Sequence, residues 1–251
     1  MVSLGMDDYG PSTYGDRIAD VYDAWFHPPS DPGAAVDFLA ELAGSGPALE
    51  LAIGTGRIAL PLVARGVEVR GIDASQAMVA KLREKTGGAD IPVTMGDFAD
   101  VGVEGRFRLV FVVFNTLFAL LTQDDQRRCV RNVAEHLTDD GVFVVEAFVP
   151  DIARFDRGQR VQTHRVEPGR VFLDVSIHDP EHQRVSVELI VLKDESKFQM
   201  FPVELRYIWP SELDLMAQLA GLELRERWGG WNREPFTGEG AHVSVYQKAS
   251  D

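Results

Sequence analysis

The feature that most constrains the fold is a buried strand that runs directly into a pair of glycines. Residues 48–53 are apolar apart from Glu50, which predicts a short strand in the interior of a sheet. Gly54 and Gly56 have no Cβ, so the chain can turn sharply there, and residues 57–65 follow as a predicted helix. Such a turn directs the free N–H groups of a helix start toward a small polar ligand. The stretch therefore predicts a parallel α/β fold with a ligand site at the turn.

A second predicted strand, residues 67–72, ends in Asp73. In βαβ units a carboxylate about twenty residues after the first glycine accepts hydrogen bonds from ribose hydroxyls. Two cofactor classes use this arrangement, and the spacing of the glycines with Ala59 also fits nicotinamide dinucleotides. Glu50 favours the other class, because a carboxylate ahead of the turn repels a pyrophosphate and suits an ammonium or sulfonium ligand.

Residues 50–56, Glu-Leu-Ala-Ile-Gly-Thr-Gly, resemble the first motif of the class I S-adenosylmethionine-dependent methyltransferases. Ala52 stands where many members of that family have glycine. Later stretches resemble further motifs of the family in the same order: the ribose-binding motif at 71–78, the adenine-binding motif at 95–98, the fourth motif at 109–116 and the fifth strand at 141–146. The resemblance extends from about residue 14 to residue 150.

The resemblance implies an α/β fold with a doubly wound, mostly parallel seven-stranded sheet that binds S-adenosyl-L-methionine as methyl donor. It implies no metal ion. The residues that match the cofactor-binding positions, together with two tyrosines of a predicted N-terminal helix, are Tyr14, Tyr22, Glu50, Ala52, Gly54, Thr55, Gly56, Asp73, Ala74, Met78, Asp97, Phe98, Phe114 and Asn115.

Beyond residue 150 the alternation of strands and helices gives way to runs in which apolar residues recur at every second position. The runs are separated by turn-forming residues and lie at 160–166, 170–177, 185–192 and 198–207. They predict a four-stranded antiparallel meander at 151–207, inserted into an S-adenosylmethionine-binding domain made of 13–150 and 208–251. A helix from Pro210 and two strands, 222–228 and 241–248, are predicted to complete the main sheet.

A meander at this position resembles that of small-molecule N-methyltransferases of natural-product pathways, especially those that dimethylate nucleotide-linked amino sugars. In such enzymes the extra sheet is a substrate lid or a dimer interface, which implies a lid or a homodimer contact here. Residues 21–26, Val-Tyr-Asp-Ala-Trp-Phe, resemble their Y-D-x-x-Y pattern, but Phe26 replaces the second tyrosine. Residues 117–119, Leu-Phe-Ala, also lack the polar aromatic residue or histidine that such enzymes can carry there. Because of these departures, the resemblance does not identify the acceptor molecule.

Methyl transfer from a sulfonium to nitrogen or oxygen is an in-line displacement that depends mainly on positioning. An amine acceptor must be neutral when it attacks, so a nearby base assists. Glu146, at the end of the predicted fifth strand, is the candidate for this role, and Tyr22 is the candidate for orienting acceptor or donor. His164, His178 and His182 lack metal-ligand spacing and are predicted to lie on the surface. A nicotinamide-dependent oxidoreductase and an inactive S-adenosylmethionine-binding protein remain as alternatives.

The composition of the chain limits which kinds of binding partner we expect. With 25 Lys and Arg against 39 Asp and Glu, the formal net charge of −14 disfavours binding to nucleic acid or an anionic membrane. A single cysteine, Cys129, cannot form an internal disulfide and fits a reducing cytoplasm. No apolar run approaches the roughly 20 residues of a membrane span, and residues 1–10 lack a signal-peptide core. We therefore expect a soluble cytoplasmic enzyme with a small-molecule acceptor.

Overall fold

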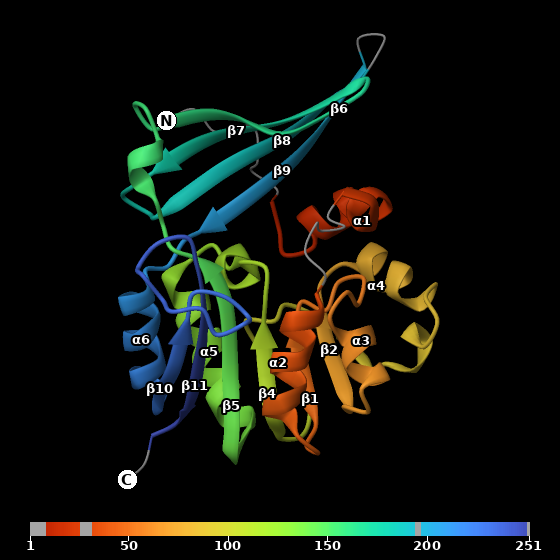
Figure 1. Ribbon diagram of the computed structural model, residues 1–251, viewed down its shortest axis with the longest axis vertical. Helices are drawn as coiled ribbons and strands as arrows, with labels where there is room; N and C mark the ends of the chain where they lie inside the picture. The colour runs from red at the N-terminus through yellow and green to blue at the C-terminus, as the bar shows by residue number, and fades with distance from the viewer. Residues whose placement is uncertain (1–8, 26–31, 194–196, 250–251) are drawn as a thin grey trace.

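The larger part of the molecule is built on a seven-stranded sheet, drawn in the lower half of Figure 1. The computed structural model describes residues 9–25, 32–193 and 197–249. The strands of this sheet are β1 (Ala48–Leu51), β2 (Val69–Asp73), β3 (Val93–Met95), β4 (Phe107–Val112), β5 (Leu137–Phe148), β10 (Leu222–Trp228) and β11 (Ala241–Lys248). They lie in the order β10-β11-β5-β4-β1-β2-β3. β11 runs opposite to the other six strands, which are parallel to one another, and this confirms the predicted mostly parallel sheet.

Helices cover both faces of this sheet because the apolar side chains of its central strands alternate. Leu109 and Phe111 of β4 join the core on the side of α2 (Gly33–Ala43), α3 (Ala59–Ala64) and α4 (Gln76–Arg83). Val110 and Val112 join the core on the side of α5 (Gln123–His136) and α6 (Pro210–Leu219). Short 3₁₀ helices, η1 (Gly88–Asp90), η2 (Thr116–Ala119) and η3 (Ile152–Arg154), lie in the connections. None of the helices in the described ranges is long and apolar enough to cross a membrane.

Two predicted boundaries differ from the structure for local reasons. The turn-forming residues 139–141 lie inside β5, where they make a bulge: Phe107 of β4 pairs with Leu137, but Leu109 pairs with Val142. The helix expected from residue 57 begins only at Ala59, because the turn continues through Ile58.

The four predicted strands of the insert form a separate antiparallel sheet, which confirms the meander. They are β6 (Gln159–Glu167), β7 (Arg170–Asp179), β8 (Arg184–Lys193) and β9 (Lys197–Arg206), in that order across the sheet. The N-terminal helix α1 (Thr13–Trp25) lies between this sheet and α4 (Figure 1). Ile18 of α1 is buried in one cluster with Leu189 and Phe201 of the insert and Met78 of α4.

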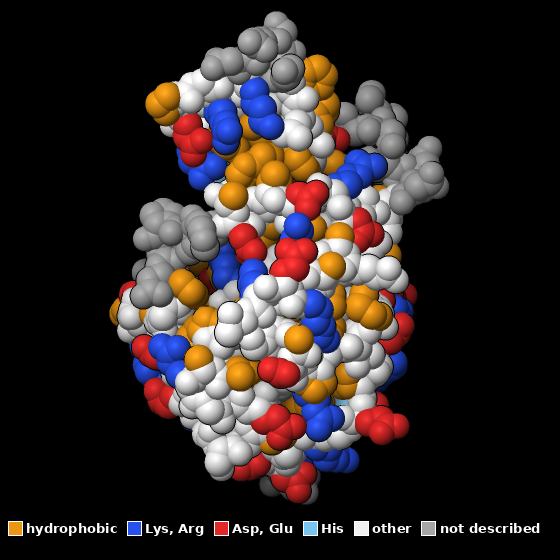
Figure 2. Space-filling model, turned by 90° about the vertical axis from the view of Figure 1, so that its right-hand side faces the viewer, with side chains coloured by type: hydrophobic (Ala, Val, Ile, Leu, Met, Phe, Trp, Pro, Cys, Tyr) orange, Lys and Arg blue, Asp and Glu red, His pale blue; other side chains and the backbone are white. Residues whose placement is uncertain are grey.

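The insert also carries exposed hydrophobic side chains. On the strands they are Val161, Val166, Leu192, Phe198 and Met200, with 42 to 69% of each residue's surface exposed. On the face of the molecule seen in Figure 2, hydrophobic side chains gather over the insert in the upper part, beside lysines and arginines. The insert therefore presents apolar surface outward as well as toward α1.

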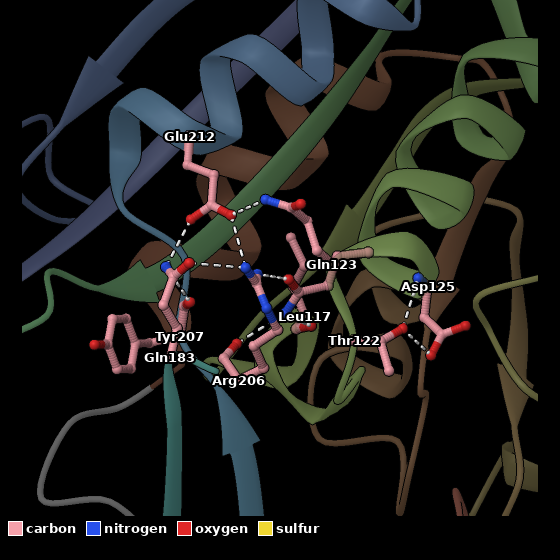
Figure 3. Close-up of polar contacts among 9 residues, drawn as sticks. Leu117, Thr122, Gln123, Asp125, Gln183, Arg206, Tyr207 and Glu212 are labelled. Atoms are coloured by element: carbon pink, nitrogen blue, oxygen red, sulfur yellow. Dashed lines mark hydrogen bonds and ion pairs between the residues drawn. The ribbon is translucent and has the colours of Figure 1, made fainter. Parts of the chain in front are cut away.

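A buried polar network joins the end of the insert to the starts of α5 and α6 (Figure 3). The Arg206 side chain, 6% exposed, donates to Glu212 Oε1 and Gln183 Oε1 at 2.9 Å each, and to Gln126 Oε1. The amides of Gln123 and Gln183 each donate to the Glu212 carboxylate at 2.8 Å. The network thus fixes where β9 enters the α/β part.

Candidate functional site

A cavity of about 620 Å³ lies where the carboxyl ends of β1, β2 and β4 face α1 and the insert. Most of the residues predicted to bind the cofactor come together in its wall. They are Tyr14, Tyr22, Glu50, Ala52, Gly54, Thr55, Asp73, Ala74, Met78, Asp97, Phe98, Phe114 and Asn115. Two predicted site residues, Gly56 and Glu146, do not line it.

The two glycines of the turn do different things, although both have positive φ, 56° at Gly54 and 78° at Gly56. A Cβ at Gly54 would approach no atom closer than Met78 Cε, at 3.8 Å, so this position opens onto the cavity. A Cβ at Gly56 would lie only 2.4 Å from Leu82 Cδ1 of α4. Gly56 is therefore required for packing of the turn on α4.

Asp73 fixes the turn and keeps acceptor capacity for a ligand. Its Oδ2 accepts from the Gly54 N–H at 2.7 Å, and its Oδ1 accepts from the Ser75 N–H at 2.8 Å. Burial raises the pKa of Asp73, while these N–H groups act in the opposite direction. Each carboxylate oxygen can accept a further hydrogen bond, which suits the two hydroxyls of a ribose.

Glu50 is the clearest sign of a cationic ligand. It is 3% exposed, and its Oε2 has no hydrogen-bond partner within the described ranges. Burial raises the pKa of Glu50 well above its ordinary value, and the nearby Asp73 raises it further, against the Ala59 N–H and Arg57. A buried, unsatisfied acceptor is costly unless a ligand completes it. The ammonium of S-adenosylmethionine is such a partner, so the residues present fit this donor.

Replacing Glu50 by Gln is expected to stabilise the ligand-free protein and weaken donor binding. The pKa of Glu50 is higher in the folded than in the unfolded chain, so the wild type loses stability as pH rises through this range. At pH 8 the free energy of unfolding of E50Q should exceed that of wild type by about 1–3 kcal/mol, and the gain should shrink toward pH 5. Urea denaturation at both pH values measures this. Glu68, on the surface, provides the control E68Q; an equally large gain there, or none in E50Q, contradicts the interpretation.

The end of β4 is held in a conformation that most residues avoid. Phe114 and Asn115 have φ of 56° and 64°. The Phe114 N–H donates to Glu146 Oε2 at 2.8 Å, and Asn115 Oδ1 accepts from the Phe148 N–H at 2.7 Å. The other Glu146 oxygen accepts from Trp231 Nε1 at 3.1 Å. Glu146 therefore supports the cavity wall from behind.

Polar contacts dock α1 on the glycine turn and on α4. Thr55 Oγ1 donates to Asp23 Oδ1 at 2.7 Å, and Lys85 Nζ lies 2.7 Å from Asp23 Oδ2. The Ser75 hydroxyl donates to Asp16 Oδ1 at 2.6 Å. These contacts hold the tyrosine side of α1 over the cavity.

The sequence did not single out several residues that form the rest of the wall. Tyr9 lines the cavity, and its hydroxyl accepts from the Glu204 N–H at 3.3 Å. Arg57 lines it with its guanidinium stacked 3.6 Å from the centre of the Phe114 ring. The one available signal for Arg57 was its place directly after the glycine turn. The insert contributes an apolar wall that consists of Val187, Leu189, Val203 and Leu205.

The three histidines of the insert differ in position. His164, expected on the surface, is half exposed but also lines the cavity, with Nδ1 3.5 Å from Asp174 Oδ2. His178 is partly buried, since it stacks on Phe155 and lies 3.0 Å from the Tyr207 hydroxyl. His182 is exposed, as expected. No cluster of metal-ligating side chains occurs in the part of the chain that the structure describes.

Comparisons with known proteins show that the chain is similar to methyltransferases. Residues 48–141 match a family described as a methyltransferase domain. The structure of the CcbJ methyltransferase from Streptomyces caelestis is similar with a TM-score of 0.92 and 44% identity, over 96% of this chain and 100% of that one. The amino pentose methyltransferase CalS10 from Micromonospora echinaspora, solved with S-adenosylmethionine bound, has a TM-score of 0.66 and 25% identity over 90% and 96% of the two chains. The cypemycin N-terminal methyltransferase of a Streptomyces species is 26% identical over 243 residues, 94% of this chain and 97% of the relative.

Proposed function

The chain belongs to the S-adenosylmethionine-dependent methyltransferases, and we propose that it methylates a nitrogen or oxygen atom of a small-molecule acceptor. The observation that carries this proposal is a single cavity lined both by the donor-binding turn and by the apolar face of the insert. An enclosed wall of this kind suits an acceptor the size of a metabolite.

The donor supplies an electrophilic methyl group on a sulfonium when it is bound. The residues of this chain have the task of binding, alignment and exclusion of water. Asp73 and Glu50 offer acceptors to the ribose and the ammonium, and Asp97 and Phe98 stand where the adenine-binding motif of the family lies. Tyr22, partly buried on α1 at the cavity wall, is proposed to orient the donor or the acceptor.

Nitrogen is the favoured acceptor atom within this proposal. Proteins similar over most of the chain include one named an N-terminal methyltransferase and one described as an amino pentose methyltransferase. An amine must lose a proton before or during attack. We propose His164, which lines the cavity on the insert beside Asp174, as the group that takes up that proton.

We propose residues 151–207 as a substrate lid, because the insert supplies the apolar wall opposite the donor-binding turn. The exposed hydrophobic side chains of the insert, at strand positions that do not face the cavity, support a second role as a homodimer contact. Size-exclusion chromatography with light scattering tests the dimer, and Phe198→Ser should shift a dimer to monomer without loss of donor binding.

The proposed activity is tested in two steps. Calorimetric titration with S-adenosylhomocysteine and with NAD should show binding of the first and none of the second. A panel of amine and phenol metabolites is then incubated with S-adenosylmethionine, and methylated products are detected by mass spectrometry. Donor binding without turnover of any panel member would favour an inactive binding protein over the proposed enzyme.

Replacing Glu146 by Gln separates a base from a positioning residue. Gln retains one acceptor for the Phe114 N–H, but its NH₂ group opposes the Trp231 N–H. We expect S-adenosylhomocysteine affinity to fall by about 5- to 10-fold, since one hydrogen bond is worth about 1 kcal/mol, while the pH profile of the rate keeps its shape. Calorimetry and pH–rate measurements check this against E135Q, an exposed control on α5. Unchanged affinity with a lost pH limb would instead identify Glu146 as the base.

A further inference from the structure

The face of the insert that lines the cavity extends beyond the cavity itself. His164 of β6 and Asp174 of β7 are in the cavity wall. In the antiparallel pairing of these two strands, Arg160 lies opposite Ser176. Because side chains alternate along a strand, Ser176 shares a face of the sheet with Asp174, and Arg160 lies on that same face. Arg160 is therefore placed beside the cavity, on the strand that carries His164.

A second arginine, Arg154 of η3, lies next to this face. Figure 1 shows η3 as the short green helix beside the insert, on the far side from α1. The guanidinium carbon of Arg154 is 5.2 Å from the centre of the Phe155 ring and 5.9 Å from that of Phe148, the last residue of β5. Phe155 in turn stacks on His178, which lies on the cavity-facing side of β7. Arg154 is therefore held between the end of β5 and the insert.

The two arginines are near enough to repel each other. Loss of hydration lowers the pKa of Arg154, and the positive charge of Arg160 lowers it further, against Asp151 and Asp174. Within the ranges that the structure describes, neither guanidinium forms an ion pair or a hydrogen bond. Both side chains therefore keep donors for a partner from outside the chain.

Three other arginines of the insert do have carboxylate partners. They are Arg165, Arg184 and Arg206, which pair with Glu167, Glu204 and Glu212 at 3.0, 3.2 and 2.9 Å. In a chain with 39 acidic and 25 basic residues, two neighbouring arginines without such a partner are unfavourable for the ligand-free protein, because like charges repel. An oxyanion bound between them would remove this repulsion, and the planar guanidinium group matches phosphate and carboxylate oxygens in pairs.

We propose that Arg154 and Arg160 bind an oxyanion of the acceptor, a phosphate or carboxylate group, while the atom to be methylated faces the donor. The proposal rests on the proposed methyl transfer to a small molecule and defines the acceptor more closely. Asp174 in the cavity wall is complementary to a cationic amine, and the two arginines are complementary to an acid. The acceptor is then an amine that carries an acidic group at a distance from its nitrogen atom.

The test measures anion binding directly, with inorganic pyrophosphate and succinate as probes. Calorimetry is done on the full chain in the presence of S-adenosylhomocysteine, so that the donor site is occupied. The double variant R154M/R160M should bind the preferred probe about 10-fold more weakly than wild type, because charge-assisted hydrogen bonds are lost. R154K/R160K should recover part of the affinity, since it restores the charges without the planar fork.

The control is R170M/R225M, which changes the net charge by the same amount at two exposed positions and should bind the probes like wild type. Weaker binding in R154M/R160M alone supports the proposal, and the probe that wild type prefers identifies phosphate or carboxylate as the acidic group. No binding to wild type, an equal loss in the control, or wild-type affinity in R154M/R160M overturns it. Thermal denaturation and the affinity for S-adenosylhomocysteine check that R154M/R160M is folded.

The proposed activity is judged separately, because the probes bind without an acceptor. Absence of turnover on every panel member counts against methyl transfer and leaves the anion site intact. For an acceptor that does react and carries an acidic group, R154M/R160M should raise KM by about 10-fold and leave kcat unchanged. An equal rise in KM for the counterpart of this acceptor without the acidic group would contradict the proposed role of the two arginines.

Discussion

Replacing Asp73 by alanine is expected to weaken S-adenosylhomocysteine binding by about 10- to 100-fold, because hydrogen bonds to a charged group contribute about 1.5–3 kcal/mol. Two losses act together in this variant. The ribose hydroxyls would lose the acceptor proposed for them, and the Gly54 N–H loses the carboxylate oxygen that accepts from it at 2.7 Å. The turn that faces the ligand is therefore less well fixed in the free protein.

Asp73→Asn separates these two losses. The amide keeps one oxygen acceptor and the volume of the side chain, so it should retain part of the affinity. Asp37→Ala, on the exposed side of α2 and paired with Arg65 at the surface, is the matched control and should bind like wild type. Isothermal titration calorimetry measures all three variants. Wild-type affinity in D73A would show that the donor is bound elsewhere.

The features that the sequence predicted correctly are those determined by residues close together in the chain. Gly54 and Asp73 are predictable because strand, turn and helix are contiguous and the second strand follows within one βαβ unit. The alternating runs of the insert likewise determine each strand without distant contacts. The order of motifs then identified the mostly parallel seven-stranded sheet.

What could not be predicted depends on residues far apart in the chain. The role of Gly56 depends on Leu82 in α4, and that of Glu146 depends on Trp231, 85 positions later. His164 reaches the cavity only because the insert folds back over the end of the sheet. Neither spacing nor residue type carries such information.

The same limit applies to the junction that holds the insert in place. Arg206, Glu212 and their glutamine partners come from three segments, and nothing in their spacing marks them as a unit. Because these side chains are buried, we expect a substitution at the junction to change the free energy of unfolding strongly. A buried ion pair adds little net stability when intact, but removing one partner leaves an uncompensated charge.

Replacing Arg206 by Met is therefore expected to lower the free energy of unfolding by about 3–5 kcal/mol. Burial alone would raise the pKa of Glu212, but hydrogen bonds from Gln183, Arg206 and Gln123 outweigh it and lower that pKa. The stability from this carboxylate is present above its unfolded pKa and lost as pH falls through the folded value. The deficit of R206M should accordingly be full at pH 7 and shrink in acid, where Glu212 takes up a proton. Urea denaturation at pH 7 and pH 4 measures both.

Two further variants make the result specific. Arg225→Met, on an exposed position of β10, should change stability by less than about 0.5 kcal/mol. The double variant R206M/E212L should recover most of the loss, because an apolar pair of similar volume can replace a buried ion pair. Since β9 enters the α/β part through this network, R206M should also raise the exposure of the insert to limited proteolysis. A deficit below about 1 kcal/mol at pH 7, or one that the second substitution deepens, would show that the apolar contacts of α1 hold the insert in place without this junction.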